Sequence, residues 1–287
     1  MGNLSVRERL KYASALSLKH EELRGSLEFY KKILQIQQEI DDDPAKGARQ
    51  NGADQSVIAG LQETCLQEKK PLICRVDPSI FNYSILLPTS KQVLRALIKE
   101  RPTNEGLENL LNLIESGKTD LSEFVGAALR EDTSTIRKHA EKLHLEPSLL
   151  LYVISVLIQP FLEHIARKID TSFSDKWWQT FCPVCGRLPI VARIRRRKRY
   201  LVCAFCGAEY LSDHFVCIHC GNSDPYTLKY MADSEKPGFQ ISFCTKCKHY
   251  VKVIDEDSVR EPIPRGLEDA FTLDLDLVAK HAGLKRD

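Results

Sequence analysis

The sequence contains 287 residues, of which 43% are hydrophobic, and its 41 basic residues nearly balance its 39 acidic ones. This composition excludes an intrinsically disordered chain and a strongly cationic protein that coats nucleic acid. The ten cysteines are unevenly spread, because eight of them fall between Cys182 and Cys247 and only Cys65 and Cys74 come earlier. The composition therefore divides the chain into a long cysteine-poor part and a short cysteine-rich part.

The cysteine-poor part has the periodicity of a helical domain. Apolar residues recur at helical spacing over 20–40, and the Asp-, Gly- and Asn-rich stretch 41–56 predicts a surface loop. Three prolines predict that the segment 71–88 is irregular, and clear helical periodicity begins again at Thr89. Further on, Asp120 followed by Glu123 matches a capping box.

The most apolar run of the chain is Leu149–Leu162. Its fourteen residues are too few to cross a bilayer, and Pro160 interrupts them, so we expect a buried core helix over 148–167. Pro147 fits the first turn of that helix. The N-terminal residues show no signal-peptide pattern, so we expect no membrane span and a location in the cytoplasm.

A cluster of aromatic residues, Trp177, Trp178 and Phe181, leads into the cysteine-rich part. We expect these rings to join the two parts, with a partner-binding surface as the alternative. Beyond them, β-branched and aromatic stretches predict short strands.

The end of the chain returns to a helical pattern. Leu267, Phe271, Leu275 and Val278 are spaced four, four and three residues apart, which predicts one face of a C-terminal helix.

All eight clustered cysteines form C-x-x-C pairs separated by spacers of 17, 10 and 23 residues. In such a knuckle, a tight turn directs two thiolates at one ion, and two knuckles complete a tetrahedral site. A glycine follows three of the pairs, where the turn needs a permissive backbone, whereas Lys248 follows the fourth. The pairs are Cys182 with Cys185, Cys203 with Cys206, Cys217 with Cys220, and Cys244 with Cys247.

The four knuckles can pair into two metal sites sequentially or in a cross-braced manner. Sequential pairing closes hairpins with the usual ribbon spacing, while a cross-braced arrangement of first with third and second with fourth is geometrically allowed. Either arrangement gives two tetrathiolate sites, and four sulfurs suit zinc and a single iron ion equally well. The interpretation as metal ligands is favoured over a dithiol redox role, because the βαβ setting of thioredoxin-like chemistry is missing from the pattern.

A basic run over Arg193–Arg199 lies inside the first hairpin and raises the question of nucleic-acid binding. Residues 182–287 hold 17 basic and 14 acidic residues, and two divalent ions with eight thiolates would bring their formal charge from +3 to about −1. That balance disfavours nucleic acid and favours docking to an acidic protein patch. The partner-binding candidates are Arg195, Arg196, Arg197, Arg199, Trp177 and Trp178.

From Cys182 to the end, the motifs resemble those of the formate dehydrogenase accessory proteins of the FdhE type. The order CPVCGRLP, RYLVCAFCGAEY, VCIHCG, FCTKCKHYVKVID and LEDAFTLDLDLVAKHAGL follows the family pattern, including a tail that ordinary zinc ribbons lack. The chain departs from the pattern at Tyr210, where Trp is usual, and in the strongly basic hairpin 193–199.

The resemblance implies an α fold with a small β part. A helical domain (1–172) is followed by two rubredoxin-like or zinc-ribbon metal modules (173–210 and 211–260) and a C-terminal helical tail (261–287). It implies that Cys182, Cys185, Cys203, Cys206, Cys217, Cys220, Cys244 and Cys247 bind two metal ions, iron or zinc.

The function implied by the resemblance is that of a cytoplasmic, non-catalytic maturation protein. Its partner would be the catalytic subunit of a molybdenum- or tungsten-dependent formate dehydrogenase, and the resemblance is compatible with a homodimer. The alternatives from other classes are a nucleic-acid-binding zinc-ribbon protein and a rubredoxin-like redox protein.

Overall fold

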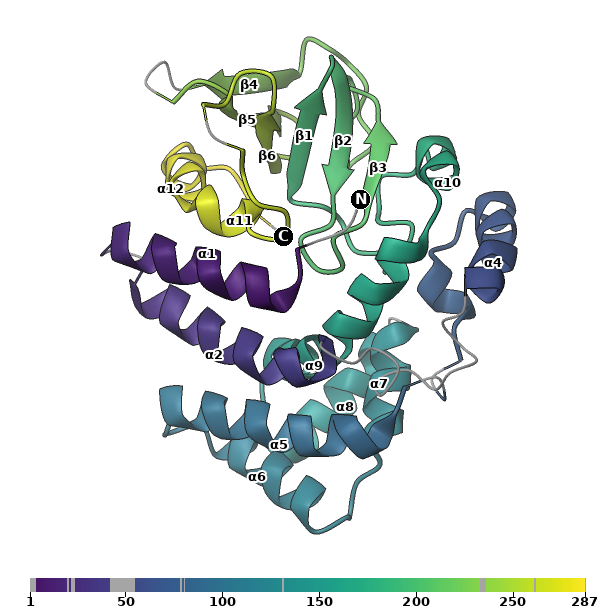
Figure 1. The fold of residues 1–287 in the computed structure, drawn as a ribbon, viewed down its shortest axis with the longest axis vertical. Coiled ribbons are helices and arrows are strands. Elements are labelled where there is room, and N and C mark those ends of the chain that lie inside the picture. The colour runs from purple at the N-terminus through teal and green to yellow at the C-terminus, as the bar shows by residue number, and fades with distance from the viewer. Residues whose placement is uncertain are drawn as a thin grey trace. The chain divides into compact units, whose positions relative to one another are not determined.

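The computed structural model describes residues 4–19, 21, 24–41, 55–77, 79, 81–130, 132–232, 236–260 and 262–286. Most of the predicted surface loop 41–56 lies outside the described residues. The chain forms two compact units (Figure 1). The helical unit comprises Ser5–Val57 and Ile73–His164, and the cysteine-rich unit comprises Met1–Leu4, Ile58–Leu72 and Ile165–Asp287.

The helical unit is built from amphipathic helices with polar caps. Asn82, Asn104, Asp120 and Asp132 each accept a hydrogen bond from a backbone N–H of the following first turn, which satisfies one of its unpaired donors. The helices assigned wholly or mainly to this unit are α1 (Val6–Lys19), α2 (Arg24–Asp41), α5 (Tyr83–Glu100), α6 (Glu105–Glu115), α7 (Leu121–Leu129), α8 (Thr133–Leu143) and α9 (Pro147–Lys168).

The predicted capping box before α7 is half formed. Asp120 caps the helix as predicted, by accepting from the N–H of Ser122 at 2.8 Å. The side chain of Glu123 instead contacts His139 Nε2 at 3.0 Å, on the neighbouring helix α8. The interhelical contact therefore takes the place of the reciprocal bond to the cap.

Helix α5 starts earlier than the prolines predicted. Its cap, Asn82, accepts from the N–H of Ser84 at 3.1 Å, so the helix begins at Tyr83 and carries Pro88 in its second turn. A proline there leaves one carbonyl of the first turn without its donor, a cost limited to the start of the helix. The irregular segment therefore ends before Tyr83 and not at Thr89 as predicted.

Helix α9 is the apolar core helix that the sequence predicted, and it starts at Pro147. It runs through Pro160 without a break to Lys168. Among the described helices, α9 alone is long and apolar enough to cross a membrane, but 78% of its apolar window is buried within the protein. Its fully buried Glu163 accepts a charge-assisted hydrogen bond from Arg9 on α1 at 2.6 Å.

The cysteine-rich unit centres on a six-stranded sheet with the order β3-β2-β1-β6-β5-β4 (Figure 1). Neighbouring strands are antiparallel except β1 and β6, which run parallel with Val191 opposite Lys252. The two predicted modules thus share one continuous sheet. The strands are β1 (Val191–Arg195), β2 (Lys198–Val202), β3 (Glu209–Ser212), β4 (Leu228–Ala232), β5 (Phe239–Cys244) and β6 (Tyr250–Asp255).

Helices flank this sheet within the same unit. The short α10 (Thr171–Lys176) packs against β3, and most of α4 (Gln55–Glu68) also belongs to the unit. The backbone N–H of Leu72, after α4, donates to the carbonyl of Pro183 at 2.8 Å, and thereby ties an early segment to the first knuckle.

The C-terminal tail forms two helices and not the single predicted one. They are α11 (Glu268–Phe271) and α12 (Leu273–His281), separated at Thr272, whose hydroxyl bonds back to the carbonyl of Glu268 at 2.7 Å. Leu275 is buried as predicted, but Val278 is 49% exposed. The break turns α12, so that the fully buried Ala279 packs with Leu275 against the sheet.

Candidate metal centres

The four C-x-x-C loops adopt one turn geometry. In each, the carbonyl of the first cysteine accepts from the N–H four residues later, and its own N–H donates to the carbonyl five residues later, at 2.8 to 3.1 Å. The fifth residue of each turn has a positive φ, between 66° and 78°. Glycine meets that requirement three times, while Lys248 adopts it with a side chain, at φ 66°.

The first cysteine group combines the first two knuckles. Cys182 and Cys206 place their sulfurs 3.5 Å apart, and Cys185 and Cys203 place theirs 3.4 Å apart. Three of the four residues are buried, and Cys185 is partly exposed. The backbone N–H of Val184 points at the Cys182 sulfur from 3.4 Å, which is a donor of the kind that stabilises a thiolate.

The second cysteine group combines the last two knuckles and is more open. The Cys217 and Cys247 sulfurs lie 3.6 Å apart, and those of Cys220 and Cys244 lie 3.9 Å apart. Cys220 is exposed and Cys247 partly so. The side-chain amide of Asn222 approaches the Cys244 sulfur at 3.5 Å.

These distances fit tetrahedral ions. Four sulfurs about 2.3 Å from a central zinc or iron ion lie about 3.8 Å from one another, whereas a disulfide requires about 2.05 Å. Within each group all four sulfurs lie within 4.8 Å of one another. The grouping confirms the sequential pairing of the knuckles over the cross-braced one, and both groups could hold a metal ion.

The electrostatics of the two groups also suit a cation. Burial raises the pKa of the Cys182 and Cys206 thiols well above their usual value. In the second group, burial raises the pKa of Cys217 to about 12. Four crowded sulfurs cannot all carry negative charge alone, but a bound divalent ion deprotonates its thiol ligands outright. The donor set thus matches zinc or iron, and the bound ion would supply the crosslink between knuckles.

The basic hairpin is only partly a surface. Arg199 is 4% exposed, donates to the carbonyl of Asp213 at 2.8 Å, and burial lowers its pKa to about 10. Arg195 is half-buried against Glu209 and stacks its guanidinium over the Tyr200 ring at 4.5 Å. Side chains available to a partner are therefore fewer than the sequence suggests.

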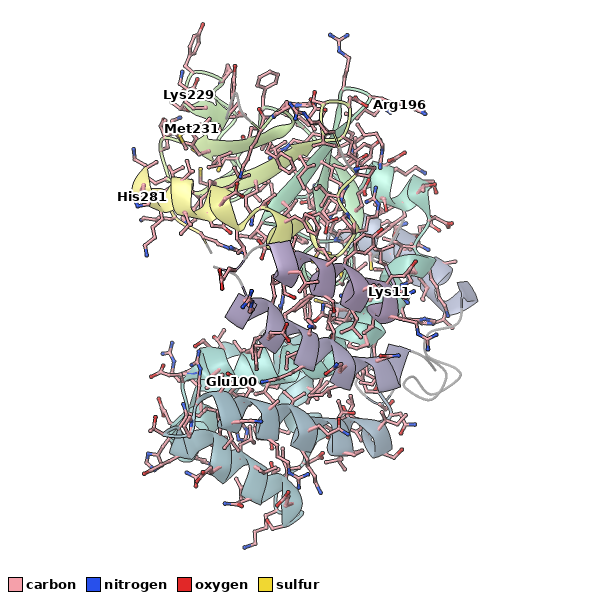
Figure 2. The ribbon with its side chains drawn as sticks, turned by 60° about the vertical axis from the view of Figure 1, so that its left-hand side comes forward. Lys11, Glu100, Arg196, Lys229, Met231 and His281 are labelled. Atoms are coloured by element: carbon pink, nitrogen blue, oxygen red, sulfur yellow. The ribbon has the colours of Figure 1, made fainter. Side chains whose placement is uncertain are left out.

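The tip of the same hairpin carries the exposed cations. Arg196 and Arg197 are exposed and both have positive φ, at 50° and 65°, as a tight two-residue turn requires. The N–H of Arg196 donates to Asp257 Oδ2 at 2.9 Å. Figure 2 shows Arg196 reaching outward from the hairpin.

The two tryptophans have different surroundings. Trp177 is 1% exposed and donates from Nε1 to the carbonyl of Phe181 at 2.7 Å, so it supports the approach to the first knuckle from within. Trp178 is 61% exposed. Of the pair, only Trp178 offers its ring to a partner in this conformation.

Two buried cations hold the tail to the sheet: Arg193, which the sequence analysis placed in the basic run, and Lys252, which it did not single out. Arg193 on β1 pairs with Glu268 at 2.7 Å and with Glu256 at 2.6 Å. Lys252 on β6 is fully buried and pairs with Asp276 at 2.9 Å and with Asp269. For Lys252, the only sequence signal was a cation within the mostly apolar stretch YVKVID.

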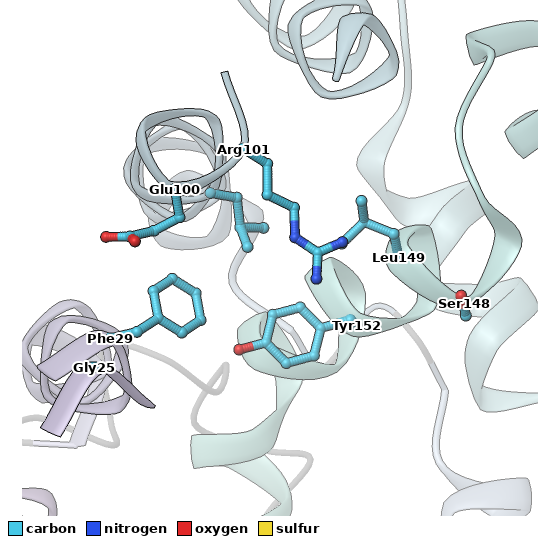
Figure 3. Close-up of a pocket in the computed structure, with 8 residues that line it drawn as sticks. Gly25, Phe29, Glu100, Arg101, Ser148, Leu149 and Tyr152 are labelled. Carbon is cyan, nitrogen blue, oxygen red and sulfur yellow. The ribbon is translucent and has the colours of Figure 1, made fainter. Parts of the chain in front are cut away.

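The helical unit holds a separate pocket of about 540 Å³ between α2, α5 and the start of α9 (Figure 3). Figure 3 shows the Arg101 side chain directed toward Tyr152, with Phe29 facing them from α2. The lining residues include no histidine, cysteine or aspartate. The cysteine groups are therefore the better candidate site.

Comparison with known proteins finds similarity to one family. A family model described as "FdhE, central domain" matches residues 181–213, which contain both knuckles of the first cysteine group. A protein FdhE homolog from Aquifex aeolicus (strain VF5) is 32% identical over 186 residues. This chain is similar to proteins of the FdhE type. The family resemblance inferred from the motifs is thereby confirmed.

The extent of the matches varies among these relatives. The Aquifex match covers 61% of this chain and 64% of the relative, and a homolog from Stutzerimonas stutzeri (strain A1501) is 30% identical over 49% of this chain and 47% of its own length. The chain's matches thus span about half to two thirds of these FdhE relatives. The crystal structure of the FdhE protein from Pseudomonas aeruginosa matches with a TM-score of 0.58 at 20% identity, over 98% of this chain and 93% of that one, and so shares its fold.

Proposed function

We propose that this chain is a cytoplasmic, non-catalytic accessory protein that binds an incomplete catalytic subunit of a molybdenum- or tungsten-dependent formate dehydrogenase. The observation that carries the proposal is the pair of four-cysteine groups on one continuous sheet, in a chain that is similar to FdhE proteins. Thiolates that fill all four positions around an ion leave no open position for a substrate. The eight cysteines are thus suited to shaping a surface.

We infer that each group holds one zinc or iron ion and that the ions keep this surface folded. Two of the apolar clusters on the sheet comprise four and three buried residues. A metal crosslink between knuckles adds to the stability that such clusters provide. The exposed cations Arg196 and Arg197 and the ring of Trp178 would then contact the client, while the buried Arg199 and Trp177 support them from within.

Anaerobic affinity purification from a host that expresses a formate dehydrogenase tests the proposal. The wild-type chain should co-purify with the catalytic subunit and with two metal ions per chain. Replacing Cys182→Ser together with Cys185→Ser should remove one ion and abolish co-purification. Cys74→Ser, an exposed cysteine outside both groups, is the matched control and should retain both.

Two results would count against the proposal. Undiminished subunit binding by the double variant after confirmed metal loss would separate the ions from the docking surface. An iron–thiolate spectrum that cycles reversibly with a redox partner, without any subunit binding, would favour the rubredoxin-like redox protein instead.

A further inference from the structure

The sheet has one open edge within the described part of the chain. Strand β4 ends the strand order, and β5 is the only strand hydrogen-bonded to it there. Tyr230 at its centre is 73% exposed, and Lys229 beside it is also exposed. Figure 2 shows Lys229 and Met231 at the outer side of the sheet, away from the hairpin that carries Arg196. The opposite edge differs, because α10 packs against β3.

The two metal modules repeat one order of parts: a knuckle, two antiparallel strands, a second knuckle and a third strand. Strand β4 therefore corresponds to β1, and β6 to β3. The register fixes the correspondence residue by residue. Val202, which directly precedes Cys203, pairs with Val191, while Cys244 itself pairs with Leu228, so Leu228 is the counterpart of Ile190.

The outer edge of β1 shows what such an edge accepts. Strand β6 lies along it in parallel, and the N–H groups of Lys252 and Glu256 donate to the carbonyls of Ile190 and Ile194 at 3.0 and 2.9 Å. An exposed strand edge offers the same row of backbone donors and acceptors to any extended segment.

Strand β4 presents the equivalent backbone groups outward. The N–H of Thr245 donates to the carbonyl of Thr227, and antiparallel pairs alternate between bonded and non-bonded. Lys229 and Met231 therefore bond to β5, while the groups of Leu228, Tyr230 and Ala232 face away from it. Under the correspondence, these three match Ile190, Ala192 and Ile194, the outward set of β1.

We propose that the free edge of β4 binds an extended segment of the client polypeptide, running parallel to β4 as β6 runs parallel to β1. The inference rests on the proposed function and names the docking edge for it. A second copy continuing the sheet in the same manner would have to offer its β3, the edge against which α10 packs. We therefore assign the free edge of β4 to a segment of the client and not to a second copy of this chain.

The two faces of the sheet define the chemistry of that segment. Met231 packs on the apolar cluster that Ile241, Tyr250, Leu275 and Ala279 form beneath α12, so the client residue opposite Met231 should be apolar. Residues one position away point to the other face, beside the exposed ring of Tyr230, where polar or aromatic side chains fit.

The test removes one outward donor without breaking the sheet. Tyr230→Pro deletes an N–H that does not bond to β5, and edge positions of this kind tolerate proline. Tyr230→Thr is the matched control, because it removes the ring and keeps the N–H. With full-length chains carrying two metal ions, the proline variant should bind the catalytic subunit at least about tenfold more weakly, and the threonine variant should stay within about threefold.

Hydrogen exchange on the wild-type complex provides the second readout. The amides of Tyr230 and Ala232 should become protected upon binding, while that of Lys229, already bonded to β5, should change little. Equal affinity of wild type and the proline variant, or no new protection, would overturn the edge proposal and leave the proposed function standing.

Two further outcomes bear on the proposal. No binding by the wild-type chain would defeat the proposed function and this inference with it. A wild-type dimer that the proline variant converts to monomer, with client binding unchanged, would assign the edge to a second copy instead.

Discussion

The two cysteine groups share a turn geometry and differ in their access to solvent. All four knuckles repeat the same pair of backbone hydrogen bonds, yet the first group is buried apart from Cys185, whereas Cys220 of the second is exposed. Around the first group lie the buried Val184 and Trp177 and the bond from Leu72 to Pro183. The geometry of a thiolate site is therefore encoded locally, and its accessibility is set by segments distant in sequence.

The largest expected effect comes from removing each site in turn. Cys182→Ser with Cys185→Ser should lower the free energy of unfolding by several kcal/mol and abolish a cooperative transition of the sheet, because metal binding and folding are coupled. The equivalent Cys217→Ser with Cys220→Ser should cost less, since part of that group already contacts water. Thermal unfolding with parallel metal analysis measures both, and equal losses would remove the distinction between the sites.

The buried cations that hold the tail provide the next comparison. Arg193→Met should cost about 3–5 kcal/mol, because it leaves the 3% exposed Glu268 without its cation. Lys252→Met should cost less, about 1–3 kcal/mol, since Arg286 still pairs with Asp269 and Asp276 at 2.7 and 2.8 Å. Urea unfolding at constant metal load checks the order, and a larger loss for Lys252→Met would contradict it.

Chelation should separate the two ions in time. We expect the second site to release its ion at least about tenfold faster than the first, a difference of about 1.4 kcal/mol in barrier height. Cysteine alkylation during treatment with a chelator, followed by peptide mass analysis, assigns the order. Cys217, Cys220, Cys244 and Cys247 should be labelled before the first group, and simultaneous labelling would argue against a buried first site.

The smallest effect concerns the fifth residue of the knuckles. Gly221→Ala should cost about 1 kcal/mol, because φ is +68° there and no neighbouring atom lies within 4 Å of an added methyl group to add a clash. Lys248→Gly should stabilise the second module by about 0.5–1 kcal/mol, since it relieves the same backbone cost. Lys246→Gly, without a positive φ, is the control and should not stabilise; a gain there would point to charge removal instead.

Much of the metal-binding region could be predicted from local signals. The C-x-x-C spacing indicated the eight cysteines and favoured their sequential grouping, and β-branched and aromatic stretches indicated short strands in this part. The cap Asp120 and the first-turn residue Pro147 could also be predicted, because helix starts depend on neighbours in sequence.

The remaining features depend on contacts between distant segments. The parallel pairing of β1 with β6 merges the two modules, and no pattern within either strand specifies that partner. The same holds for Arg193 and Arg199, which the sequence indicates as surface cations. In the fold they are buried, and they donate to the Glu268 carboxylate and the Asp213 carbonyl, respectively. Pro88 led to the wrong prediction that the segment before Thr89 is irregular, because the cap at Asn82 starts the helix at Tyr83 despite the proline.

The hydrogen bond from Leu72 to Pro183 has a consequence for how the chain matures on the ribosome. The segment Ile58–Leu72 is synthesised early, but the rest of its compact unit begins only at Ile165. During translation, the residues Ile73–His164 are synthesised before the segments that this early segment packs against, and the helices among them can already fold. Long-range closure of this type slows folding and leaves apolar surface uncovered in the interval. The protein that we propose to assist the assembly of an enzyme thus completes its own cysteine-rich unit late.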